Sequence, residues 1–394
     1  MNRKEKMNLY RVLAVIAIAL VTFCITAVLC AKNHLYTDEW LCLIFIDIIF
    51  ILVYLFELEY ERRLGHLSGN QQTNFIRIAI IYALCAVLTY VMTFLPEFFR
   101  PVILIPILMS AVSNTTMAMT VGLFLDILLA LSAGGSFYAL ASFCIMTMLG
   151  AVLSRALREK KYRIWIACLF LFINLMVPGI LYYLTYKEIT NEIFVYGAAD
   201  GVITAFTSFF LFGWIWHESV SEVDNKLLDI VSEDYSEVKA LKDFSMFEYR
   251  HASKVSDIAF RCAQKLEYNA KLCLAAGFYY RMGRWLGEPY VENGVDKAYN
   301  LCFPQKLITI LSEYYGEKKL PSTPESALIH MIDALVIKLE ALEQDVGKSQ
   351  WNRDILIYQT LNEFSSTGMY DESGMSMNQF LKVREFLAKE EMLS

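Results

Sequence analysis

The sequence lacks the motifs that identify many enzymes directly. It has no Walker loop, no G-x-S-x-G elbow and no H-E-x-x-H helix, so the common phosphate-binding, esterase and zinc-protease sites have no signature here. Its nine cysteines are scattered without a C-x-x-C pair, which indicates neither a structural zinc site nor a disulfide framework. Period-two alternation of apolar and polar residues is also lacking. The absence of this strand pattern favours an all-α protein.

Negative charge outnumbers positive charge in the second half of the chain. From residue 217 onward there are 20 Lys and Arg against 28 Asp and Glu, a net charge of −8. Proteins that bind nucleic acid need a basic surface for the phosphate backbone. Nucleic acid is therefore not an expected partner.

Apolar sequence is abundant instead, and it is concentrated before residue 217. Hydrophobic residues make up 56% of the chain. A run of about 20 apolar residues is long enough to cross a bilayer as a helix. The sequence thus predicts an integral membrane domain over residues 1–216, with the lipid bilayer as its partner. The apolar runs are Leu9–Cys30, Leu41–Phe56, Ile78–Leu95, Val102–Leu131, Phe137–Leu153, Ile164–Tyr183 and Ile193–Trp216.

Polar residues around Ser113 and Asn114 divide the longest run, Val102–Leu131, into two short segments, which gives about eight membrane helices. Cytoplasmic loops concentrate Lys and Arg, and the strongest basic cluster lies between Arg155 and Arg163. Eight crossings place the basic N-terminus, this cluster and the C-terminal domain together in the cytoplasm. We therefore expect a multi-pass protein of the cell membrane.

Three carboxylates, Asp47, Asp126 and Asp200, lie within or near the apolar helices. Because an ionisable group at bilayer depth is costly, such residues face a bundle interior or water. They indicate either a binding pocket or ion relay, or packing positions that hydrogen-bond a neighbouring helix. Asp126 is the best functional candidate, because apolar residues surround it on both sides. Asp200 lies between Gly197 and Gly201, where small residues allow helices to approach closely.

The composition changes at residue 217. Residues 217–242 are polar and acidic with spaced apolar positions, which predicts a linker helix that leaves the membrane. Residues 243–394 predict a separate all-α domain. Helices are expected near 247–268, 270–283, 304–315, 324–344, 351–363 and 376–392, with turns between them.

Two segments of this domain carry a family resemblance: Tyr249-Arg250-His251 and the run from Phe278 to Arg284. With the preceding membrane helices, they resemble the seven-transmembrane HD-domain proteins of bacteria, which include phosphodiesterases that hydrolyse cyclic di-AMP. The resemblance covers roughly residues 75 to 345. It implies an HD-like fold in the C-terminal domain. The extracellular domain that the family has between its first two helices is replaced by the loop Lys32–Trp40.

The resemblance also implies which residues would have bound metal. His251 matches the first metal-binding histidine of the family, and Asp333 matches its last metal-binding aspartate. The His-Asp pair that names the family is replaced by Tyr280-Arg281, although Gly283 is retained and Arg284 keeps the charge of the phosphate-binding lysine.

A later His-His-Gly of the family is replaced as well, by Tyr314-Tyr315-Gly316. A dinuclear centre needs several His and Asp ligands to hold two cations and activate water. Phenol and guanidinium do not replace imidazole and carboxylate as ligands. We therefore expect no cofactor, and a domain that has kept its shape and lost its hydrolytic chemistry.

These considerations favour a membrane signalling or regulatory protein with a catalytically inactive, degenerate HD-like domain. That domain could bind a cyclic dinucleotide through the charges of Arg281, Arg284 and His251, bind a cytoplasmic protein, or form a homodimer. Alternatively, His251 only hydrogen-bonds a neighbour on the helix surface. Asp333 is expected to pair with Arg281 or Arg284 and to fill the former metal cavity.

Two other functions remain open. The first is an active, metal-dependent cyclic di-AMP phosphodiesterase with an atypical site, which would need Mn or Fe. The second is a transporter built around Asp126 and Asp200, although clear repeats and paired broken helices are lacking.

Overall fold

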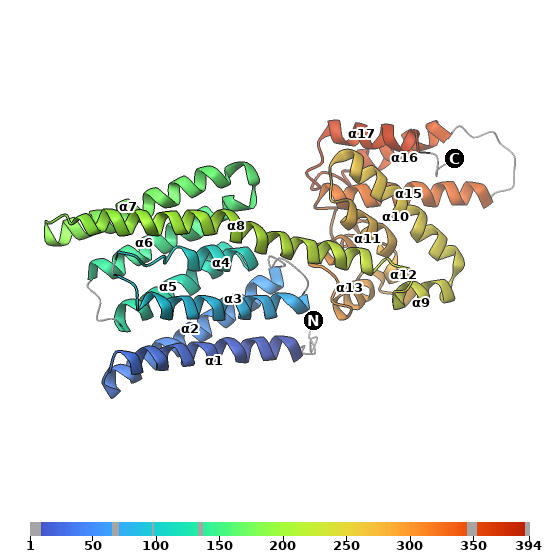
Figure 1. The fold of residues 1–394 in the computed structure, drawn as a ribbon. Coiled ribbons are helices and arrows are strands. Elements are labelled where there is room, and N and C mark those ends of the chain that lie inside the picture. Colours follow the sequence, from blue (N-terminus) through green and yellow to red (C-terminus); the bar gives the residue numbers. More distant parts are fainter. Residues whose placement is uncertain (1–8, 65–70, 97, 133–136, 345–352, 391–394) are drawn as a thin grey trace. The chain divides into compact units, whose positions relative to one another are not determined.

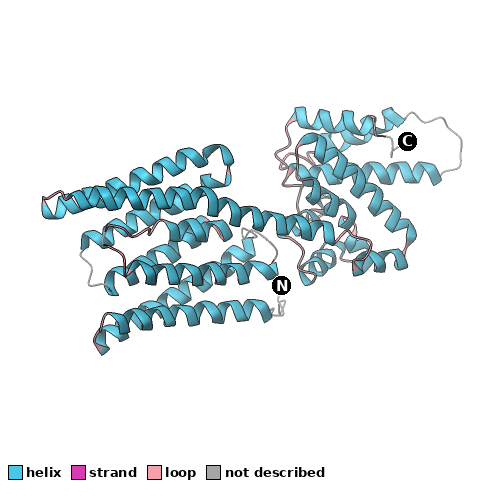
Figure 2. Ribbon diagram, viewed as in Figure 1, coloured by secondary structure: helices cyan, strands magenta, loops and turns pink. Residues whose placement is uncertain are grey.

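The computed structural model describes residues 9–64, 71–96, 98–132, 137–344 and 353–390. Every regular element in these ranges is a helix (Figure 2), which confirms the all-α class. The chain divides into two compact units, Met1–Ser221 and Glu222–Ser394. The basic residues at the N-terminus lie outside the described ranges.

The apolar runs of the sequence form the helices of the first unit (Figure 1). Six of them, α1, α2, α3, α6, α7 and α8, are long and apolar enough to cross a membrane. Large apolar side chains such as Leu52, Trp165 and Phe206 are exposed on this unit, as expected of helices that face lipid. The bounds are α1 Leu9–Lys32, α2 Thr37–Leu64, α3 Gln71–Met92, α4 Leu104–Val112, α5 Thr115–Ser132, α6 Phe137–Ser154, α7 Arg163–Tyr186 and α8 Asn191–Asp229.

The run Val102–Leu131 divides where the polar residues predicted, between α4 and α5. Asn114 caps the new helix, because its Oδ1 accepts a hydrogen bond of 2.9 Å from the backbone N–H of Met117. All residues of α4 are buried, and nine residues extend only about 14 Å, which is shorter than a bilayer core. Eight crossings were expected, but six helices in the described ranges are of spanning length, since α4 is an internal helix and the apolar part of α5, Thr115–Leu131, is shorter than a span.

The second unit is built around α10, α11 and α15, whose buried faces form one hydrophobic core. Three of its helices have an N-cap residue whose side chain accepts a hydrogen bond from a backbone N–H of the first turn. These residues are Ser245 for α10, Asn269 for α11 and Ser376 for α17. The bounds are α9 Ser236–Phe244, α10 Met246–Leu266, α11 Ala270–Tyr279, α12 Met282–Leu286, α13 Tyr290–Asn300, α14 Gln305–Ser312, α15 Pro324–Gln344, α16 Arg353–Ser366 and α17 Met377–Ala388.

The segment 217–242, predicted as a linker helix, is divided between the end of α8, a turn and most of α9. Leu227, in the last turn of α8, and Ile230, directly after the helix, are buried in the core of the second unit. The hydroxyl of Tyr279 donates a hydrogen bond of 2.5 Å to the carbonyl of Ile230. The last turn of α8 is therefore an integral part of this unit.

Two expectations about these helices were wrong. The helix predicted over 270–283 ends at Tyr279, because the backbone turns at Arg281 (φ −95°, ψ 14°) before α12 begins. Helix α13 was not predicted, because its sequence contains Asn293, Gly294 and Asp296 and reads as a turn. A Cβ added at Gly294 would lie 3.0 Å from the nitrogen of Gly283, so α13 packs closely against α12 at this point.

Candidate functional site

His251 is the centre of a buried polar network in the second unit. It lies in α10, and its side chain is only 1% exposed. Its Nε2 is 2.9 Å from Oδ1 of Asp333, and its Nδ1 is 2.7 Å from Oε2 of Glu340. Asp333 and Glu340 both belong to α15, two turns apart, so they share a helix face. The histidine therefore faces a carboxylate at each ring nitrogen.

Two tyrosines, Tyr280 and Tyr315, complete the network. The hydroxyl of Tyr315 donates to Oδ2 of Asp333 at 3.0 Å, and the backbone N–H of Tyr315 donates to the hydroxyl of Tyr280 at 3.1 Å. Tyr315 has a left-handed backbone (φ 51°, ψ 18°), which is uncommon for a bulky residue. In this conformation the backbone N–H of Tyr315 donates to Tyr280 while its side-chain hydroxyl donates to Asp333.

The arginines do not bond to Asp333, so that predicted pairing was wrong. Nη1 of Arg281 lies 3.6 Å from Oε2 of Glu248, near the start of α10, and the arginine is buried. Both oxygens of Asp333 are used by His251 and Tyr315 instead. The turn before α12 directs Arg281 toward α10, and this turn could not be deduced from the sequence.

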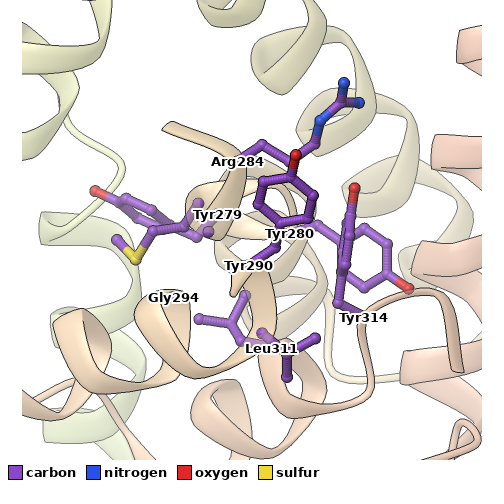
Figure 3. Close-up of a pocket in the computed structure, with 10 residues that line it drawn as sticks. Tyr279, Tyr280, Arg284, Tyr290, Gly294, Leu311 and Tyr314 are labelled. Carbon is purple, nitrogen blue, oxygen red and sulfur yellow. The ribbon is translucent and has the colours of Figure 1, made fainter. Parts of the chain in front are cut away.

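Arg284 is exposed on α12. It lines a small hollow together with Tyr280, Tyr290 and Tyr314 (Figure 3). The rings of Tyr280 and Tyr314 are in contact there, with their centroids 5.1 Å apart. The hollow has an empty volume of about 220 Å³, which includes its open mouth. Of the three predicted phosphate-binding residues, Arg284 alone is exposed at this hollow, while His251 and Arg281 are buried.

The charge of the network follows from its contacts. Burial lowers the pKa of His251, but the hydrogen bonds and negative charges of Asp333 and Glu340 oppose it. The net result is a pKa above the ordinary imidazole value. The imidazolium form, which donates from both nitrogens, is thereby favoured between two carboxylates.

This arrangement does not fit a dinuclear metal centre. A metal-binding imidazole must be neutral and offer a lone pair, whereas both nitrogens of His251 are engaged by carboxylates. Both oxygens of Asp333 already take part in hydrogen bonds, one with His251 and one with Tyr315. Within the described ranges, no group of three or more His, Cys, Asp or Glu side chains is placed to hold a metal ion.

His330 and Glu340 belong to this region and were not predicted. His330 is buried in α15, its Nδ1 lies 3.0 Å from the hydroxyl of Tyr370, and its ring contacts Tyr315 and Phe364. Burial lowers the pKa of His330 to about 4. Glu340 could have been found by its spacing of seven residues from Asp333, which places both on one helix face. His251 was expected on the helix surface if it had no ligand, and its burial corrects that interpretation.

The three intramembrane carboxylates are all buried, in different helices. Oδ1 of Asp47 in α2 accepts a hydrogen bond of 2.9 Å from Thr26 of α1. Neither oxygen of Asp126 in α5 has a hydrogen-bond partner among the described residues, and Oδ1 of Asp200 in α8 has none either. Asp200 lines a hollow in the first unit, together with residues of α6 and α7.

Two solved structures are similar to part of this chain. One is the HD domain of the L. monocytogenes phosphodiesterase PgpH, at 16% identity and a TM-score of 0.34 over 40% of this chain and 97% of that chain. The other is the same domain in complex with cyclic-di-AMP, at 15% identity and a TM-score of 0.35 over the same shares. No protein-family model and no curated protein matches the chain.

Proposed function

We propose that this chain is a membrane signalling or regulatory protein whose second unit is a pseudoenzyme: an HD-like scaffold without hydrolytic chemistry. The observation that carries the proposal is the pair of carboxylates, Asp333 and Glu340, at 2.9 and 2.7 Å from the two nitrogens of His251. In place of open ligand positions, the site has a closed hydrogen-bond network. The six apolar helices of spanning length in the first unit support the membrane location of the protein.

The packing around the network supports the same reading. Tyr280 and Tyr315 stand where the resembled family has histidines, and their rings lie 6.2 Å apart in a contact that also includes Tyr314. Aromatic rings of this size fill a cavity and contribute dispersion energy, but they do not coordinate a divalent cation. The residues at the old ligand positions thus stabilise the domain.

Hydrolysis by the purified full chain tests this proposal. The chain in detergent is incubated with cyclic di-AMP and manganese, and product formation is followed by chromatography. We expect no turnover above that of a matched His251→Asn, Asp333→Asn double variant. Turnover that this variant lacks and that a chelator abolishes would establish the alternative, an active phosphodiesterase.

The ligand of such a regulator is a separate question. We propose that Arg284, exposed at the hollow of Figure 3, is the residue most available to a phosphate group, because it is a charged donor at an open site. Titration calorimetry of the full chain with cyclic dinucleotides tests this. A heat of binding that the wild-type chain shows and the Arg284→Gln variant lacks supports nucleotide binding at this residue. If the wild-type chain shows no heat of binding at high nucleotide concentration, a protein partner or homodimer is left as the regulatory contact.

We further propose that the N-terminus and the second unit are cytoplasmic. The support is the basic cluster between Arg155 and Arg163, which follows α6. Labelling of single engineered cysteines in intact cells tests the orientation. A membrane-impermeant reagent should fail to reach a cysteine placed in the loop between α6 and α7.

A further inference from the structure

A hollow in the first unit has the lining of a small binding site. Its walls come from α6, α7, α8 and the segment before α4. Most of its empty volume of about 310 Å³ is open to solvent, and the enclosed part has room for a group of about the size of one water molecule. It carries one acidic and one basic residue, Asp200 and Arg100, together with the hydroxyl residue Ser142. The other lining residues are apolar or aromatic, and the aromatic ones are Phe98, Tyr138 and Phe143.

The carboxylate of Asp200 is held in this hollow without a full set of partners. Asp200 is 2% exposed, and its Oδ1 has no hydrogen-bond partner among the described residues. One turn later on α8, the buried hydroxyl of Thr204 has no hydrogen-bond partner in the described part of the chain either. A buried acceptor without a donor costs free energy, and a charged one in a membrane costs more. A donor supplied by a ligand would remove that cost.

The backbone on both sides of Asp200 is packed closely against α7. An added Cβ at Gly201 would lie 2.9 Å from the Cα of Leu171, and one at Gly197 would lie 3.1 Å from the carbonyl oxygen of Asn174. Helices α7 and α8 are therefore in direct backbone contact on both sides of Asp200. Pro178, in the wall of the hollow, interrupts the hydrogen bonding of α7 at this level.

The hollow lies toward one end of the bundle. Tyr138 is in the first turn of α6, Pro178 is two turns before the end of α7, and Asp200 follows the start of α8 by nine residues. These three places meet at the end of the first unit opposite the turn that joins α6 to α7. A molecule at the membrane surface could reach this end without crossing the bilayer.

From these observations we propose that the hollow binds a small zwitterion, with its ammonium group at Asp200 and its acidic group at Arg100. An ammonium group is about the size of a water molecule, donates three hydrogen bonds and is attracted by aromatic faces. Free amino acids and the headgroup of phosphatidylethanolamine share this chemistry. This site is independent of the second unit, so it stands whether or not that unit hydrolyses a nucleotide.

Thermal unfolding of the full chain in detergent, with a panel of probes, tests the proposal. Glycine, larger amino acids and phosphoethanolamine carry both charges, whereas methylamine and acetate carry one each. We expect saturable stabilisation by at least one zwitterion and not by the singly charged probes. Stabilisation by the amino acids assigns a free solute. Stabilisation by phosphoethanolamine alone, with retention of phosphatidylethanolamine in native mass spectra, assigns the lipid.

Three variants decide whether the effect belongs to this hollow. Asp200→Asn should weaken the response roughly 10- to 100-fold, the loss expected when a hydrogen bond to a charged group is removed. Ser142→Leu keeps both charges and narrows the hollow, so it should weaken the response as well. Asp126→Asn removes an equally buried carboxylate outside this lining and should leave it intact. No response to any zwitterion, or an equal response in Asp200→Asn, would overturn the proposal.

Discussion

Replacing Asp333 by alanine removes the acceptor that joins α10 to α15. Asp333 is fully buried, and its two oxygens accept from His251 at 2.9 Å and from Tyr315 at 3.0 Å. Breaking a buried charged pair costs about 3–5 kcal/mol, because the remaining partner is left buried and unpaired. Glu340 still contacts the other nitrogen of His251, so we expect a loss near the lower end, about 3 kcal/mol.

Amide hydrogen exchange of the full chain measures this loss of stability separately for each helix. A destabilisation of about 3 kcal/mol accelerates exchange through unfolding of the second unit roughly 100-fold, since each 1.4 kcal/mol is a factor of ten. Peptides from α10 and α15 should show it, and peptides from α1 to α7 should not. Asp234→Ala, which removes an exposed carboxylate paired with Lys239, is the matched control and should change little.

The same experiment distinguishes a network from a metal site. If Asp333 acts by hydrogen bonding, a chelator leaves the wild-type chain unchanged and the effect of Asp333→Ala remains. Should the chelator itself accelerate exchange in α10 and α15, and Asp333→Ala add nothing further, the reasoning would be refuted.

Three further predictions concern the same unit. Gly283→Ala should disrupt folding of the unit, because a Cβ there would lie 1.8 Å from the carbonyl oxygen of Tyr290; wild-type exchange in α12 and α13 would contradict this. Tyr315→Phe should cost about 1–3 kcal/mol through loss of its bond to Asp333, seen as faster exchange in α15, and no change would argue against that bond.

The third prediction is a pH dependence. The pKa of His330 falls from an ordinary 6.5 to about 4 on folding, so its stabilising contribution is complete above pH 6.5 and is lost as the pH falls toward 4. At full extent this amounts to roughly 3 kcal/mol. His330→Phe should flatten the fall in stability over that range, and an unchanged profile would show that other groups cause it.

Much of the fold could be predicted from the sequence, because apolar runs and helix periodicity are local signals. The division of Val102–Leu131 at Ser113 and Asn114 was predicted correctly, since a polar pair ends an apolar helix and Asn114 caps the next. Helix α13 was missed because Asn293, Gly294 and Asp296 are typical of a turn, although its buried residues Val291, Gly294 and Ala298 lie at helical spacing.

The partners within the candidate site could be predicted only in part. The importance of His251 and Asp333 followed from the resemblance, and the structure places them in contact. The choice of His251 over Arg281 as partner of Asp333 depends on the backbone turn at Arg281, which directs that side chain toward Glu248. Side-chain direction at such a turn is set by tertiary packing, which the sequence pattern does not contain.

The metal content of the full chain tests the central claim most directly. The protein is purified, stripped with a chelator, incubated with manganese or iron, passed through a desalting column and measured by mass spectrometry of the elements. Because both nitrogens of His251 and both oxygens of Asp333 already have partners, we expect far less than one bound metal per chain. Two metal ions per chain, lost in Asp333→Asn, would contradict the account.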